Sequence, residues 1–141
     1  MLCVEDYIDT LSWAKSVGGL KGLRARADAN ARTVADWVAK TPWIDFLAKD
    51  PSIRSNTSVC LKFTDPAITS LTADAQAEFS KKLVALVEKE AAGYDFAYYR
   101  DAPAGLRIWC GATVEASDVA LLTQWIDWAF AETKAALPKA A

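Results

Sequence analysis

The chain of 141 residues contains no histidine. Without an imidazole it can form neither a Ser-His-Asp nor a Cys-His catalytic centre, and histidine-based metal sites, zinc fingers among them, are excluded as well. Cysteine is also scarce. Cys3, Cys60 and Cys110 are an odd number at wide spacing, which is typical of reduced thiols and predicts a cytoplasmic protein. These absences make a self-contained enzyme hard to build from this chain alone.

Long apolar runs and an excess of one charge are missing too. No stretch approaches the ~20 apolar residues of a membrane-spanning helix, and the acidic start, MLCVEDYID, lacks the basic segment of a secretory signal. The net charge of −2, with no cluster of Lys and Arg, argues against nucleic acid as a partner. With 52% hydrophobic and 24% charged residues, the composition is instead that of a folded domain with its own core.

Apolar residues at helical spacing, together with helix-ending residues, predict four helices. The first has Val4, Ile8 and Leu11 on one face and has no preceding cap or strand, so we expect the chain to continue a larger structure. The predicted limits are Gly18-Gly19 as the end of the first helix, Leu20 to Thr41 for the second, Thr72 as N-cap to Gly93 as C′ for the third, and a start near Ser117-Asp118 for the last.

Alternating apolar residues predict three strands, at Ser58–Phe63, 95–99 and 107–112, and a Pro/Gly turn joins the last two as a hairpin. The predicted order is α-α-β-α-β-β-α. The fold class is therefore α+β: a two-layer sandwich of a small, mostly antiparallel three-stranded sheet with packed helices. We expect a single domain over residues 1–141, with a helical lead-in at 1–41 and the sandwich at 42–141.

Arg107 is the sharpest candidate for a binding residue. It opens the last predicted strand, directly after Ala104-Gly105 and one leucine. A guanidinium on such a rigid base presents a planar fork of donors that suits a carboxylate. The simpler alternative is an exposed strand-end arginine or one paired with a local acid such as Asp101, and from spacing alone that is the commoner case.

Arg100 lies on the same predicted hairpin loop, seven residues before Arg107. Two arginines on one loop could hold a dianion such as a phosphate monoester, since charge-assisted hydrogen bonds to phosphate are strong. Two surface charges relieved by Asp101 fit the spacing equally well. Cys110 is expected to be a small buried hydrophobe, and Trp37, Trp43, Trp125 and Trp128 are expected in the core.

Several stretches resemble the phosphoserine aminotransferases, the pyridoxal-phosphate (PLP) enzymes of serine synthesis, and most of all the form typical of alphaproteobacteria. The most specific is DAPAGLRIWCGATVEASDV, supported by MLCVEDYIDTLSWAKSVGGLKGL, RADANARTVADWV and RSNTSVCLKF. The resemblance covers the family's C-terminal, small domain, which closes over the active site of a fold-type-I homodimer. It implies transfer of an amino group between phosphoserine with 2-oxoglutarate and 3-phosphohydroxypyruvate with glutamate, and in some members a reaction of pyridoxine biosynthesis.

By the same resemblance, Arg107 corresponds to the arginine that binds the substrate α-carboxylate. Arg100 stands where other branches of the family have a histidine near the substrate phosphate. The chain has ten lysines, but none, Lys62 included, lies in a setting typical of a Schiff-base lysine. The family's cofactor-binding residues lie upstream, so the chain alone is expected to bind no PLP and to be inactive.

Two other hypotheses stay open from the sequence. One is a free-standing module that binds an anionic metabolite or another protein without catalysis. The other is a structural remnant with neither a ligand nor a defined oligomer. A piece of the aminotransferase should expose the apolar surface that packs on the missing large domain, and it should therefore tend to self-associate.

Overall fold

The computed structural model describes residues 1–138 and confirms the α+β class. Three strands form one antiparallel sheet in the order β1-β2-β3, so β2 is central. The elements in chain order are α1 (Leu2–Ser16), α2 (Gly19–Val38), β1 (Ile44–Phe46), the 3-10 turn η1 (Pro51–Ile53), β2 (Ser58–Phe63), α3 (Pro66–Thr69), α4 (Ala73–Lys89), β3 (Gly105–Trp109) and α5 (Ala116–Ala135).

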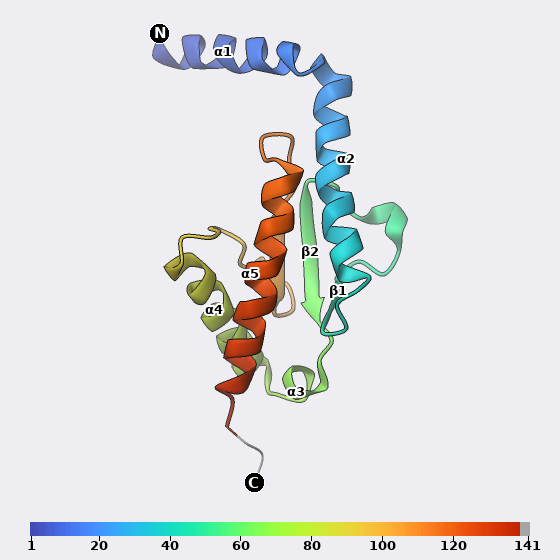
Figure 1. Ribbon diagram of the computed structural model, residues 1–141, viewed down its shortest axis with the longest axis vertical. Helices are drawn as coiled ribbons and strands as arrows, with labels where there is room; N and C mark the ends of the chain where they lie inside the picture. The colour runs from blue at the N-terminus through green and yellow to red at the C-terminus, as the bar shows by residue number, and fades with distance from the viewer. Residues whose placement is uncertain (139–141) are drawn as a thin grey trace.

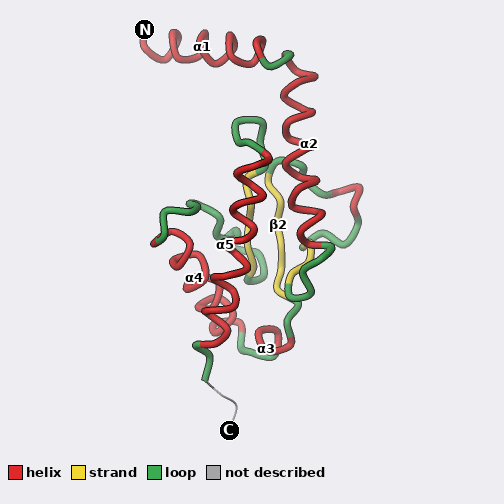
Figure 2. The backbone as a smooth tube through the Cα atoms, in the orientation of Figure 1, coloured by secondary structure: helices red, strands yellow, loops and turns green. Residues whose placement is uncertain are grey.

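The core lies between the sheet and the helix layer formed by α2, α4 and α5 (Figure 1). Every second residue of β2 is buried, as the alternation predicts, and β3 adds two more apolar side chains to the same face. An aromatic cluster joins the layers: Trp43 stacks on Phe130 at a centroid distance of 3.8 Å, and Phe63 meets Phe79 edge-on at 5.3 Å. Within residues 1–138 the helices therefore cover one face of the sheet and leave the other free of helices (Figure 2).

The prediction of a strand at residues 95–99 is wrong. Residues 95–99 contribute only an isolated bridge between Ala97 and Leu106, and the third strand is β1 at the opposite edge. Asp95 has a φ of +54°, a left-handed conformation that an extended strand does not contain. The short β1 escaped notice because three residues are too few to show an alternation.

Two predicted helix ends also need correction. Helix α4 has Thr72 as its N-cap, as expected, and the Thr72 hydroxyl accepts from Ala75 N. The helix ends at Lys89, and its left-handed C′ residue is Ala91 (φ +54°). Gly93 is a packing position instead, since an added Cβ would lie 2.6 Å from a methyl of Leu122. The second helix ends at Val38, three residues before the predicted end at Thr41.

Helix α1 projects away from the body of the molecule (Figure 1). The turn at Gly18-Gly19, where both residues have positive φ, separates it from α2 as the sequence predicted. None of its residues is buried, and its apolar face of Val4, Ile8 and Leu11 is at least half exposed. An apolar helix face of this kind normally packs against another surface.

Candidate functional site

The helix-free face of the sheet carries the polar and charged side chains of the strands. Because side chains alternate along a strand, Ser58, Cys60 and Lys62 of β2 lie on this face, and so do Arg107 and Trp109 of β3. The register sets Cys60 opposite Arg107 and Ser58 opposite Trp109. We call these five residues the open face.

Arg107 is a charged residue of the open face that neighbouring groups hold in place. Its Nη2 donates to the Asp95 carboxylate at 3.0 Å and to the Asp95 carbonyl oxygen at 3.1 Å, and its guanidinium lies 5.1 Å from the centre of the Tyr99 ring. Only 16% of the Arg107 side chain is exposed. The left-handed backbone of Asp95 lets one residue supply both acceptors. The local acid that pairs with Arg107 is therefore Asp95 and not Asp101.

The segment beside Arg107 is tied to the sheet at two points. The backbone N–H of Arg107 donates to Phe96 O at 2.9 Å as part of the bridge between Ala97 and Leu106. The hydroxyls of Tyr99 and Ser58 lie 3.0 Å apart, which connects the loop to β2. Arg107 thus lies against a fixed loop rather than at a free strand end.

The structure does not bring Arg100 into this arrangement. Its side chain is exposed, and within residues 1–138 it forms no hydrogen bond or ion pair. The sequence missed Asp95 and Tyr99 as partners of Arg107. The signal that could have found them is the bridge to β3, which brings the segment YDFAYY alongside Arg107.

Lys62 is the second cation of the open face. It is half-buried on the central strand and lies on the diagonal from Arg107, since the register pairs it with Gly105. Asp45 of β1 is directly opposite Lys62, but its carboxylate accepts from the N–H of Phe46 at 2.7 Å. Within residues 1–138 the Lys62 ammonium has no ion-pair partner.

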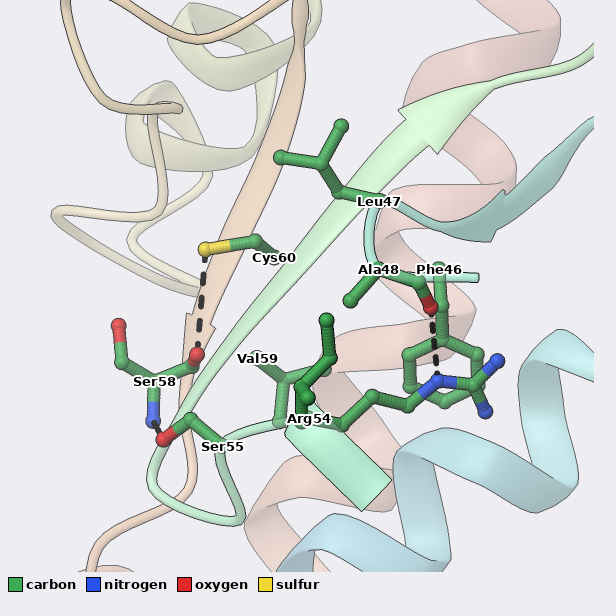
Figure 3. Close-up of a pocket in the computed structure, with 9 residues that line it drawn as sticks. Phe46, Leu47, Ala48, Arg54, Ser55, Ser58, Val59 and Cys60 are labelled. Atoms are coloured by element: carbon green, nitrogen blue, oxygen red, sulfur yellow. Dashed lines mark hydrogen bonds between the residues drawn. The ribbon is translucent and has the colours of Figure 1, made fainter. Parts of the chain in front are cut away.

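A small, mostly apolar cavity of about 250 Å³ lies beside the open face, between the loop after β1 and strand β2 (Figure 3). Arg54 borders it, but this guanidinium stacks on Phe46 at 3.9 Å and donates from Nε to Ala48 O at 2.9 Å. Its charge therefore holds the loop in place. Cys60 also lines the cavity, so the cavity adjoins the open face next to Arg107.

The structure also shows where the cysteine and the tryptophans predicted to be buried lie. Cys110 is fully buried, and burial raises the pKa of its thiol to about 11, which fits a buried hydrophobe. Trp43 is buried and Trp37 partly so. The expectation of a core position is wrong for Trp125 and Trp128, which are 39% and 38% exposed on α5.

No cluster of Cys, Asp and Glu side chains in residues 1–138 has the arrangement of a metal site. Across the same residues, no helix combines the length and the apolar character that crossing a membrane requires.

The fold and the sequence both connect the chain to one group of enzymes. No family model matches it. Among solved structures, the fold matches that of a phosphoserine aminotransferase studied for radiation damage of its Schiff base, with a TM-score of 0.66 and 14% identity, over 86% of this chain and 30% of that one. At this identity the match defines the fold alone.

The sequence then identifies the relationship. Over 130 residues the chain is 49% identical to the phosphoserine aminotransferase of Methanosarcina barkeri and 48% identical to that of Methanosarcina mazei, covering 92% of this chain and 32% of each relative. The chain is thus homologous to part of phosphoserine aminotransferase. It spans about a third of the length of these relatives.

Proposed function

We propose that the chain is the C-terminal, small domain of a PLP-dependent phosphoserine aminotransferase and that Arg107 binds the α-carboxylate of its substrate. One observation carries the proposal: a half-buried arginine is held in a fixed position on the open sheet face of a chain that is homologous to these enzymes. Residues 1–41 would form the helical lead-in and residues 42–141 the sandwich, with α2 of the lead-in packed in the helix layer.

The hydrogen bonding of Arg107 supports this role. Asp95 occupies Nη2, whereas within the described residues Nε and Nη1 have no acceptor. Those donors are available to a carboxylate that approaches from the open face. The contacts with Asp95 and the Tyr99 ring restrict the Arg107 side chain before the substrate binds. Arg107 therefore loses less side-chain entropy when it binds a substrate carboxylate.

Arg100 would be a secondary contact to the substrate phosphate. Its exposed position on the loop next to Tyr99 leaves its donors available, and a guanidinium can bind phosphate through two parallel hydrogen bonds. Within residues 1–138 no contact fixes its orientation, so this role would require the loop to order around the substrate.

The described residues do not fit PLP. A Schiff-base lysine needs an enclosed setting that favours its neutral form, whereas every described lysine except Lys62 is exposed. Lys62 lies on a strand, opposite Gly105. Because Gly105 packs against the backbone of Leu61, it does not form a glycine loop that could cradle the phosphate of PLP beside Lys62. The cofactor would therefore be held by the rest of the enzyme, and this chain alone would bind none and be inactive.

The exposed apolar face of α1 supports a larger assembly. Val4, Ile8 and Leu11 would be covered by the large domain in a cytoplasmic homodimer. The complete enzyme would convert phosphoserine and 2-oxoglutarate to 3-phosphohydroxypyruvate and glutamate, in serine biosynthesis and, for a related substrate, in pyridoxine biosynthesis. The amino-transfer chemistry would be that of PLP, while this domain would position the substrate.

A chimera tests the proposal. These residues replace the matched third of the M. barkeri enzyme, and transaminase activity is measured with phosphoserine and 2-oxoglutarate. We expect an active chimera, an inactive isolated chain and no pyridoxyl-lysine in that chain after borohydride reduction. An inactive but folded and dimeric chimera would contradict the proposal. If the isolated chain then bound phosphoserine or glutamate, the free-standing binding module would replace it.

A further inference from the structure

Lys62 and Arg107 project from neighbouring strands onto the same face of the sheet. The register pairs Cys60 with Arg107 and Lys62 with Gly105, so the two cations occupy diagonal positions. Diagonal neighbours on an antiparallel pair have Cα atoms roughly 7–8 Å apart, which long side chains can span. One small ligand can therefore contact both cations.

The charges around these two residues favour an anion. Asp95 pairs with Arg107, and Asp45 is the acid opposite Lys62. The Asp45 carboxylate is bound to the N–H of Phe46 and forms no ion pair with Lys62. Lys62 is a half-buried residue and its ammonium has no counter-ion among the described residues, so a ligand anion would pair with this charge.

We propose that Lys62 binds the second anionic group of a substrate whose α-carboxylate is bound by Arg107. The open face would then select amino acids with two anionic groups, such as phosphoserine and glutamate, over those with one. This inference rests on the proposed role of Arg107. It gives the distal group a contact on the central strand, in addition to the secondary contact proposed for Arg100, which lies on an exposed loop without a fixed contact within residues 1–138.

The test measures binding of O-phosphoserine and of serine to the 141-residue chain by calorimetry at constant ionic strength. Lys62→Gln should weaken phosphoserine binding about three- to tenfold, the range between an exposed and a half-buried charge contact, and should change serine binding less than twofold. Lys62→Arg keeps the charge and should retain most of the preference. Lys82→Gln, an exposed lysine on α4, is the control and should change neither affinity. Arg100→Gln is measured beside it, because Arg100 is the other residue proposed to contact the phosphate.

The outcomes separate this inference from the proposed function. Unchanged phosphoserine binding in Lys62→Gln, or a loss that follows Arg100→Gln instead, overturns the role of Lys62 and leaves Arg107 untouched. Arg107→Gln should weaken both amino acids. If it weakens neither, the proposed function fails whatever Lys62 does. Absence of any binding to the wild-type chain at millimolar concentrations overturns the role of Lys62 in this domain. Arg107 is then still tested by the activity of the chimera.

Discussion

Asp95 and Arg107 are joined twice, through the carboxylate and through the main-chain carbonyl of the same aspartate. Both acceptors reach Nη2 because Asp95 has a left-handed backbone conformation. Such a conformation costs a non-glycine residue roughly 1 kcal/mol, and it is tolerated best by Asn and Asp. The position of Arg107 therefore depends on the backbone of one loop residue as well as on its charge.

Asp95→Asn should reduce the free energy of unfolding by less than about 1 kcal/mol, because the Asp95 side chain is 86% exposed, which weakens the ion pair, and asparagine accepts the same backbone conformation. Asp95→Ala should cost about 1 kcal/mol more, since alanine is strained at positive φ. Urea denaturation measures both variants. Asp101→Asn, in the same loop, is the matched control. Equal stabilities of Asp95→Ala and Asp95→Asn would contradict the role given to the backbone.

Ala91→Gly should stabilise the chain by about 0.5–1 kcal/mol. Ala91 is the C′ residue of α4 and has a φ of +54°, where a Cβ is unfavourable. Ala85→Gly is the control, because Ala85 is an exposed residue within the same helix and its replacement should destabilise the chain by about 1 kcal/mol. Thermal unfolding measures both changes. A destabilised Ala91→Gly would show that this helix end is not left-handed in solution.

Asp127→Asn should stabilise the chain at neutral pH. Burial raises the pKa of the Asp127 carboxyl above its ordinary value of 3.8, although the hydrogen bonds from Trp37 Nε1 oppose this shift. The folded chain therefore binds the proton more tightly than the unfolded chain. The stability that this group contributes is complete below pH 3.8 and is lost as the pH rises through the raised pKa.

Asparagine keeps an oxygen acceptor for Trp37 and carries no charge. The stability difference between Asp127→Asn and wild type should be largest at neutral pH and should shrink as the pH falls toward 3.8. Urea denaturation across this pH range measures it. A difference that does not vary with pH would contradict the raised pKa.

Ile8→Glu should reduce self-association of the isolated chain. The exposed apolar face of α1 would otherwise associate with another copy, and a charge in its centre opposes that contact. Thr10→Glu adds the same charge to α1 away from that face and should leave association unchanged. Sedimentation velocity over a range of concentrations compares the three proteins. A wild-type chain that stays monomeric at high concentration would contradict the account of α1.

Sequence patterns were reliable where a segment was long and its burial regular. Ser58–Phe63 is a strand with the predicted buried side, and Thr72 caps the predicted helix. Patterns failed where backbone conformation or tertiary contact decided the outcome. Asp95 and Ala91 have positive φ although neither is a glycine, so the strand at 95–99 and the end of α4 were misplaced.

The candidate site was predictable only in part. The sequence singled out Arg107 and placed Lys62 on the polar side of its strand. It could not identify Asp95 as the acid that holds Arg107, because the contact spans 12 residues and depends on how the loop folds back on β3. It also could not foresee that Trp125 and Trp128 remain exposed, since α5 presents apolar residues on more than one side.

The most direct test of the central claim compares the kinetics of the chimeric aminotransferase with and without Arg107→Gln. Loss of a charged hydrogen-bond donor to the substrate carboxylate should lower kcat/KM for phosphoserine about a hundredfold. Arg107→Lys, which keeps the charge without the planar fork, should lower it less. An unchanged kcat/KM in Arg107→Gln would show that this arginine does not bind the substrate.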